Sequence, residues 1–233
     1  MLGNFHEVSV KSDDLVSSLM FYEQLGFAQL ETGDVWEHGY AVVSDGDIVI
    51  GLHQHDFDSP ALTFVRPDLK NYAYALKRAR IKPAFQKLAD DEFNELGFAD
   101  PSGIIITLLE ARTHGPPPDE RMPSLCGSFL EVSLGVDDVE SAAQFWESIG
   151  FAVVGSSDAA HPAKRLARDG LSVGLHQTRC PRALSFIGND LDGRLEFLAT
   201  KGFTPHRGTP MGHGASLVSP DGTRLLLFEA DWI

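Results

Sequence analysis

The chain has 233 residues, of which 43% are hydrophobic and 22% are charged, and this composition excludes a disordered or collagen-like protein. Its net charge of −14 at pH 7 repels phosphate backbones and anionic lipids, so we expect neither nucleic-acid nor membrane binding. It has two cysteines and no apolar run of the ~18–20 residues that cross a bilayer, and no secretory leader is visible. We therefore expect a cytoplasmic protein.

Four segments of the first half recur in the same order in the second half, which predicts two homologous halves. EVSVKSDDLVSSLMFYEQLGF at 7–27 returns as EVSLGVDDVESAAQFWESIGF at 131–151. The other recurring segments are GLHQ (51–54 and 174–177), PALTFVRPDL and RALSFIGNDL (from 60 and 182), and DPSGIIITLLEA and SPDGTRLLLFEA (from 100 and 219). We predict halves at 1–112 and 126–233, joined by an extended, proline-rich linker at 113–125.

Each half divides again into two units of the same pattern. A strand at 7–10 leads into a helix at 13–26, which has aspartate at its start and glycine at its end. The further elements that we predict are strands at 27–30, 40–44, 48–54, 62–65, 85–88, 93–98 and 104–109, and helices at 68–80, 138–149 and 190–201. The sequence thus predicts an α+β fold of four βαβββ modules, at 1–57, 58–112, 126–180 and 181–233.

These motifs resemble the vicinal oxygen chelate superfamily, which includes glyoxalase I, bleomycin-resistance proteins, fosfomycin-modifying enzymes and extradiol dioxygenases. The resemblance covers nearly the whole chain. It implies that the strands of paired modules curl into cupped mixed sheets, with a ligand inside each cup. It does not settle the function, because the superfamily contains both enzymes and catalytically inert binding proteins.

The resemblance also implies where metal ligands would stand in each cup. They would lie in the first, fourth and fifth strands and four residues after the glycine of the DPxG motif. These positions hold Glu7, Gly51, Ala61 and Thr107 in the first half and Glu131, Gly174, Ala183 and Leu226 in the second. Only one position in each cup is a good ligand, so we predict no metal of the family's kind and no cofactor.

Strand alternation turns a glutamate and a histidine into each cup. The pairs are Glu7 with His53 and Glu131 with His176. Each pair can serve as an acid–base dyad, hydrogen-bond a polar ligand, or hold a divalent metal as two ligands of an incomplete shell. The remaining possibility is that each pair is an internal hydrogen-bonded pair with no function, which both halves inherited by duplication.

Other side chains are weaker candidates for ligand contact. Trp36 near the cup mouth can stack on a planar ligand, and Arg224 can meet an anionic one. The full set of predicted ligand-binding residues is Glu7, Trp36, His53, Thr107, Glu131, His176, His213, Arg224 and Phe228. Glu110 and Glu229 have the wrong strand parity and should face away from the cups. The histidines that we place in exposed loops or the linker are His55, His114, His161 and His206.

We therefore predict a protein that sequesters a small amphipathic or aromatic molecule without the family's metal. The acidic chain and Glu7 and Glu131 favour a cationic ligand. The alternative is a lyase, isomerase or dioxygenase that uses Glu7 with His53 and Glu131 with His176, with a divalent metal or by acid–base chemistry. Four modules in one chain allow a monomer, and a homodimer is the other expectation.

Overall fold

The computed structural model describes residues 2–32, 36–90, 93–111, 124–158 and 161–232. The first half contains β1 (Asn4–Lys11), α1 (Leu15–Gln24), β2 (Ala28–Leu30), β3 (Tyr40–Ser44), β4 (Val49–His53), β5 (Ala61–Arg66), α2 (Leu69–Arg78), β6 (Pro83–Lys87), β7 (Glu95–Ala99) and β8 (Ile105–Glu110). The second half contains β9 (Ser128–Gly135), α3 (Val139–Ser148), β10 (Ala152–Ser157), β11 (Ala163–Arg168), β12 (Leu171–His176), β13 (Ala183–Gly188), α4 (Leu191–Thr200), β14 (His206–Thr209), β15 (Gly212–Val218), β16 (Arg224–Glu229) and the short 3₁₀ helix Ala230–Trp232. The predicted linker at 113–125 lies almost entirely outside the described residues.

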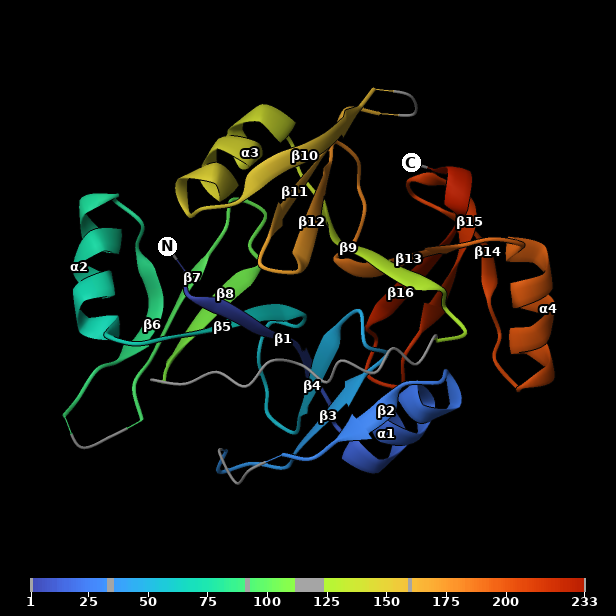
Figure 1. The fold of residues 1–233 in the computed structure, drawn as a ribbon, viewed down its shortest axis with the longest axis horizontal. Coiled ribbons are helices and arrows are strands. Elements are labelled where there is room, and N and C mark those ends of the chain that lie inside the picture. The colour runs from blue at the N-terminus through green and yellow to red at the C-terminus, as the bar shows by residue number, and fades with distance from the viewer. Residues whose placement is uncertain (1, 33–35, 91–92, 112–123, 159–160, 233) are drawn as a thin grey trace.

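Each half forms one eight-stranded mixed sheet (Figure 1). The strand orders are β2-β3-β4-β1-β5-β8-β7-β6 and β10-β11-β12-β9-β13-β16-β15-β14, so the two sheets have the same topology. Within a module the first and last strands pair in parallel, and the two modules of a half join through the antiparallel pairs β1–β5 and β9–β13. The prediction of four βαβββ modules in two halves is confirmed, and modules adjacent in sequence share a sheet.

The helices begin and end where local chemistry requires. Asp14 caps α1 by accepting hydrogen bonds from the backbone N–H groups of Val16 and Ser17. After α1 the chain turns through Gly26 at φ +95°, a conformation that glycine adopts without steric cost. After α2 the same turn is made by Arg80 at φ +60°.

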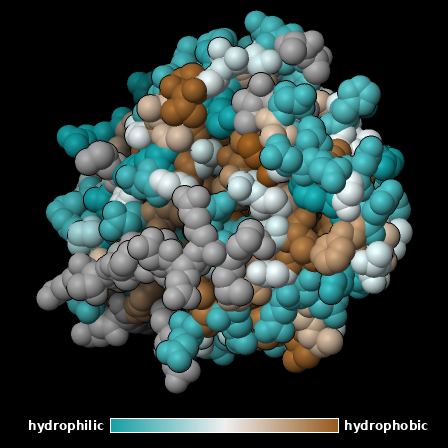
Figure 2. Space-filling model, turned by 45° about the vertical axis from the view of Figure 1, so that its right-hand side comes forward, coloured by the Kyte–Doolittle hydropathy of each residue, from teal (hydrophilic) through white to brown (hydrophobic). Residues whose placement is uncertain are grey.

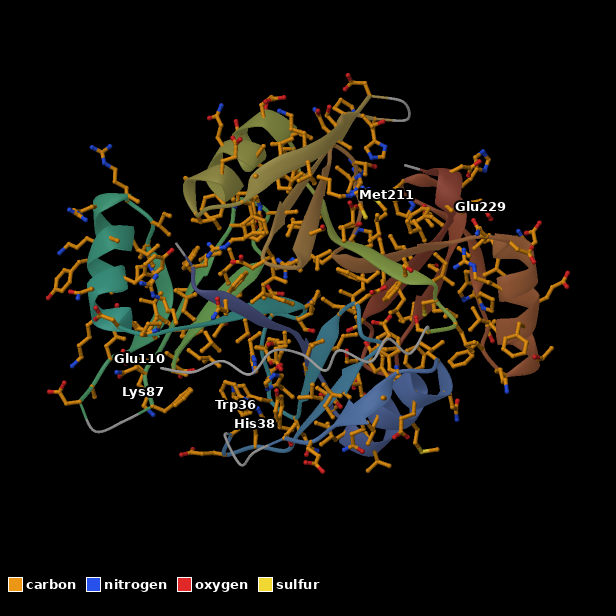
Figure 3. The ribbon with its side chains drawn as sticks, in the orientation of Figure 1. Trp36, His38, Lys87, Glu110, Met211 and Glu229 are labelled. Atoms are coloured by element: carbon orange, nitrogen blue, oxygen red, sulfur yellow. The ribbon has the colours of Figure 1, made fainter. Side chains whose placement is uncertain are left out.

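Glu110 and Glu229 serve the helices rather than the cups. Glu229 at the end of β16 accepts hydrogen bonds from the backbone N–H groups of Asp190 (2.8 Å) and Leu191 (2.7 Å), where α4 begins. Glu110 accepts one from the N–H of Leu69, the first residue of α2. The two carboxylates lie at opposite ends of the molecule (Figure 3). Each meets the positive end of a helix dipole, and the prediction that both face away from the cups is confirmed.

One hydrophobic core joins the two halves. It is built from the helix-covered faces of both sheets, with Phe27 packing against Phe186 and Phe64 against Phe151 across the halves. The indole N–H of Trp146 on α3 donates to Asp100 of the first half at 3.1 Å. This shared core holds the two halves together, and Asp58 at the wall of the first cup also forms an ion pair with Arg182 of the second half.

The surface is mostly hydrophilic, with hydrophobic residues in separate patches on the face shown in Figure 2. Large side chains such as Val16, Tyr74 and Val154 are exposed. In the part of the chain that the structure describes, no helix is long and apolar enough to cross a membrane.

Candidate active site in the first cup

Glu7 occupies the floor of the first cup. Its neighbours Val8 and Val10 on β1 point into the shared core, so alternation turns Glu7 and Ser9 toward the concave face. The Glu7 side chain is fully buried, and its carboxylate accepts hydrogen bonds from the hydroxyls of Tyr40 (2.5 Å) and Ser9 (2.8 Å). Nε2 of His53 lies 2.7 Å from the carboxylate. The predicted pairing of Glu7 with His53 is confirmed in geometry.

Glycine at position 51 makes room for this carboxylate. A Cβ atom built on Gly51 would lie 2.1 Å from a Glu7 oxygen, and one built on Gly174 would lie 1.9 Å from an oxygen of Glu131. These glycines stand where the family resemblance would place a metal ligand. In this protein the glutamate fills the space that a ligand side chain would occupy.

The hydrogen bonds continue from His53 to a second histidine. Nδ1 of His53 lies 3.0 Å from Nε2 of His38, which precedes β3. Trp36 packs beside His38, with 5.3 Å between ring centroids, and the two labelled side chains lie together in Figure 3. His38 also stacks on His55, at 5.2 Å between centroids and an interplanar angle of 20°. A chain of polar groups therefore runs from the buried floor of the cup to its mouth.

Burial and hydrogen bonding shift the proton affinities along this chain. Burial by itself would raise the pKa of Glu7, but the hydrogen bond and charge of His53 outweigh it and lower that pKa. Burial beside the Glu7 carboxylate raises the pKa of Tyr40, so its phenol stays protonated. Burial, followed by the charges of His53 and His55, lowers the pKa of His38. Glu7 is therefore ionised and His38 neutral at neutral pH.

A cavity of about 500 Å³ lies over these groups. Its wall includes the aromatic side chains of Trp36, Phe57 and Phe85, together with His38 and His53. Carboxylates, hydroxyls and small apolar groups complete it: Asp56, Asp58, Glu95, Ser9, Thr63, Thr107, Ala61 and Ile105. The predicted site residues Trp36, His53 and Thr107 thus meet in one cavity, above the buried Glu7.

The second cup repeats the two histidine contacts of the hydrogen-bonded chain, but its carboxylate has a different further partner. His176 lies 2.6 Å from Glu131, and Nε2 of His161 lies 3.1 Å from Nδ1 of His176. The position of Tyr40 is Ala163 in this half, and the guanidinium of Arg165, at the position of Val42, donates to Glu131 at 2.8 Å. Burial would raise the pKa of Glu131, but His176 and then Arg165 lower it. A permanent cation therefore already balances this carboxylate.

A small hydrophobic cluster lies on the cup side of the second sheet. A cluster separate from the shared core contains Cys180, Ala183, Met211, Leu226 and Phe228, all buried. Burial raises the pKa of the Cys180 thiol to about 12, so the thiol stays protonated. The candidate Phe228 thus lies inside this packed cluster, whereas the candidates His213 and Arg224 are exposed.

The histidines predicted to lie in exposed loops need one correction. His55 is exposed as expected, although it also lines the first cavity. His161 is only half-exposed, because it contacts His176. His206 is exposed as expected, and His114 lies outside the described residues. The available signal was a repeated spacing, because 15 residues separate the paired histidines in both halves.

The residues at the family's metal-ligand positions do not fit a metal ion. Gly51 and Ala61 carry no donor atom, and the oxygens of Glu7 are already engaged by His53, Tyr40 and Ser9. In the second cup Arg165 places a cation against Glu131. Among the described residues, no three His, Cys, Asp or Glu side chains converge as a metal site.

Comparisons with known proteins define the fold class. No family model and no curated protein matches the sequence. Among solved structures, homoprotocatechuate 2,3-dioxygenase from Brevibacterium fuscum aligns with 97% of this chain and 71% of its own, at a TM-score of 0.63 and 16% identity. A Mn(II)-bound glyoxalase from Novosphingobium aromaticivorans aligns with 98% of this chain and 82% of its own, at a TM-score of 0.60 and 14% identity. A catechol 2,3-dioxygenase aligns over 98% and 88%, at a TM-score of 0.60 and 14% identity.

These neighbours are extradiol dioxygenases and a glyoxalase, which belong to the superfamily that the sequence motifs resemble. The chain therefore shares its fold with these dioxygenases and this glyoxalase over nearly its whole length. At this level of identity the likeness concerns the fold, and the chemistry of the site has to be argued from its own residues.

Proposed function

We propose that the protein binds a small aromatic or amphipathic molecule in the first cup, through side chains rather than through a metal of the family's kind. The observation that carries this proposal is the cavity of about 500 Å³ over Glu7. Its size lies within the range of about 300–1,000 Å³ for small-molecule pockets, and it combines aromatic walls with a few convergent polar groups. Trp36, Phe57 and Phe85 offer ring faces for a planar ligand.

The charges around the cavity favour a ligand that donates hydrogen bonds or carries a positive charge. Asp56, Asp58 and Glu95 belong to the cavity wall. Asp56 is paired with Lys11, and Asp58 with Arg182. Glu7, which we expected to attract a cation directly, is buried and satisfied, so its influence reaches the ligand through His53 and His38.

The proposal assigns one ligand site to each chain. The second cup has the same fold and the same glutamate–histidine pair, but Met211, Leu226 and Phe228 are packed inside it and Arg165 neutralises Glu131. We therefore assign no ligand to the second cup, since its side chains pack against one another and its carboxylate is already paired. Sequestration in the first cup alone predicts a stoichiometry of one ligand per chain.

A screen for thermal stabilisation by small aromatic compounds tests the proposal, because a ligand that binds only the folded state raises the midpoint. We expect hits that bind once per chain in calorimetry and lose affinity in Trp36→Ala. Phe197→Ala is the matched control, since Phe197 is an exposed aromatic residue on α4. Hits unaffected by Trp36→Ala but weakened by changes in the second cup would contradict the proposal.

Metal analysis of the purified protein separates this proposal from a metalloenzyme. We expect far less than one equivalent of iron, manganese, nickel or zinc per chain. A full equivalent that is lost in the double variant His53→Ala, His176→Ala would overturn the proposal.

A further inference from the structure

The geometry of the first cup points to a specific role for His38, a residue outside the predicted set. We infer that His38 accepts a proton from the bound ligand and that the resulting positive charge moves to His53, where it pairs with Glu7. This inference rests on the ligand site proposed above. It adds a chemical class of ligand, namely a planar molecule with an acidic O–H or N–H group.

The first step is the direction of each hydrogen bond. An ionised carboxylate only accepts hydrogen bonds, and Glu7 already accepts them from Tyr40 and Ser9, so Nε2 of His53 must carry a proton and donate it. When His53 is neutral, its Nδ1 is therefore an acceptor. The 3.0 Å contact with Nε2 of His38 then requires His38 to donate from that atom. Neutral His38 is left with a lone pair on Nδ1.

The second step is where that lone pair lies. His38 and His53 both belong to the cavity wall, and the ring of His38 packs against the rings of Trp36 and His55. Within the described part of the chain, Nδ1 of His38 makes no hydrogen bond. The cavity therefore presents a fixed hydrogen-bond acceptor beside aromatic faces that suit a planar ligand.

The third step is the proton balance. The ligand's O–H or N–H bond breaks and its proton forms a bond to Nδ1 of His38, while the electron pair stays on the ligand. The proton on Nε2 of His38 passes to Nδ1 of His53 over the 3.0 Å contact. His38 is then neutral again with the opposite tautomer, and His53 is an imidazolium 2.7 Å from the Glu7 carboxylate. No other reactant is needed.

The surroundings of the relay favour this movement of charge. Tyr40 and Ser9 hold Glu7 without bringing a positive charge, so an imidazolium on His53 balances it at hydrogen-bond distance, with His6 as a second histidine whose charge acts on the carboxylate. Two carboxylates of the cavity wall are paired with cations, Asp56 with Lys11 and Asp58 with Arg182, which reduces their repulsion of the ionised ligand. In the second cup Arg165 already balances the charge of Glu131, so this carboxylate would stabilise a protonated His176 less than Glu7 stabilises a protonated His53. The second cup is therefore an internal comparison within the same chain.

Nitrogen NMR of the histidine rings, with assignments from His38→Ala and His161→Ala, tests the relay in the ligand-free protein. On acidification we expect His53 to become doubly protonated, while His38 stays neutral and its ring proton moves from Nε2 to Nδ1. Double protonation of His38 before His53, or a His38 tautomer that never changes, would overturn the inference. Folding of each variant is checked by circular dichroism.

A ligand test uses 4-nitrophenol, whose ionised form is yellow and whose neutral form is nearly colourless. Below the pH at which the free compound ionises, we expect the wild type to bind it with the yellow band. We expect Glu7→Gln to weaken this band several-fold, His38→Ala to abolish it, and the matched control His161→Ala to retain it. Quenching of Trp36 fluorescence without the yellow band refutes the relay and leaves ligand binding intact. If 4-nitrophenol does not bind at all, the aromatic ligand class fails for this compound and the ring NMR decides the relay.

Discussion

Gly51 and Gly174 leave the space in which the buried carboxylates of the two cups lie. We expect Gly51→Ala to destabilise the fold by about 1–3 kcal/mol, because the added methyl group collides with a carboxylate held by three hydrogen bonds. Urea unfolding measures the loss. Gly155→Ala is the matched control, since a Cβ at this strand glycine would meet its nearest neighbour at an ordinary 3.9 Å. Equal losses in the two variants would contradict this account.

The lowered pKa of Glu7 predicts how stability depends on pH. Its contribution to the free energy of unfolding is fully present above the ordinary glutamate pKa of about 4.3 and is lost as the pH falls through the lower pKa of the folded state. We expect the stability difference between wild type and Glu7→Gln to shrink progressively as the pH falls below this range. Urea unfolding at a series of pH values measures it. A difference that is constant with pH would show that the charge of Glu7 does not contribute.

The floor of the first cup was predictable from sequence, whereas the mouth was not. Alternation along a strand places Glu7, Ser9 and His53 on one face, because successive side chains point to opposite sides. His38 and His55 stand just outside the strands, where no periodicity fixes the direction of a side chain. Their packing against Trp36 and His53 is a tertiary contact that only the folded chain creates.

At the scale of elements, the strand-end glutamates connect the sheets to the helices. We expect Glu229→Ala to cost about 1 kcal/mol, since it removes the acceptor for two N–H groups at the start of α4 and a negative charge near the helix dipole. The midpoint of urea unfolding reports this change. Glu196→Ala, on the exposed face of the same helix, is the control and should change stability much less. A similar loss in both variants would argue against a capping role.

The helices and strands themselves could be predicted closely from local features of the sequence. The predicted helix at 138–149 corresponds to α3 (Val139–Ser148), because Asp138 caps its start and Gly150 turns the chain at its end. Which modules share a sheet could not be predicted from the sequence. The alternation of side chains along the strands and the capping of the helices are the same whichever modules pair. The contact of β1 with β5 decides it, and this contact joins segments far apart in the sequence.

At the scale of the whole molecule, the shared core predicts that the two halves unfold together. We expect Trp146→Phe to destabilise the protein by about 1–3 kcal/mol, because it leaves an oxygen of the buried Asp100 without its N–H donor. Fluorescence and circular dichroism should report the same single transition. Trp36→Phe makes the same chemical change away from the interface between the halves and should cost less. Separate transitions for the two halves would contradict a common core.

The lining of the first cavity also shows what duplication can provide. All the residues in its wall belong to the first half. A molecule bound there needs no side chain of the second half in the cavity wall, and the second half contributes to stability through the shared core. The side chains of the second cup were thus able to change without altering the lining of the first.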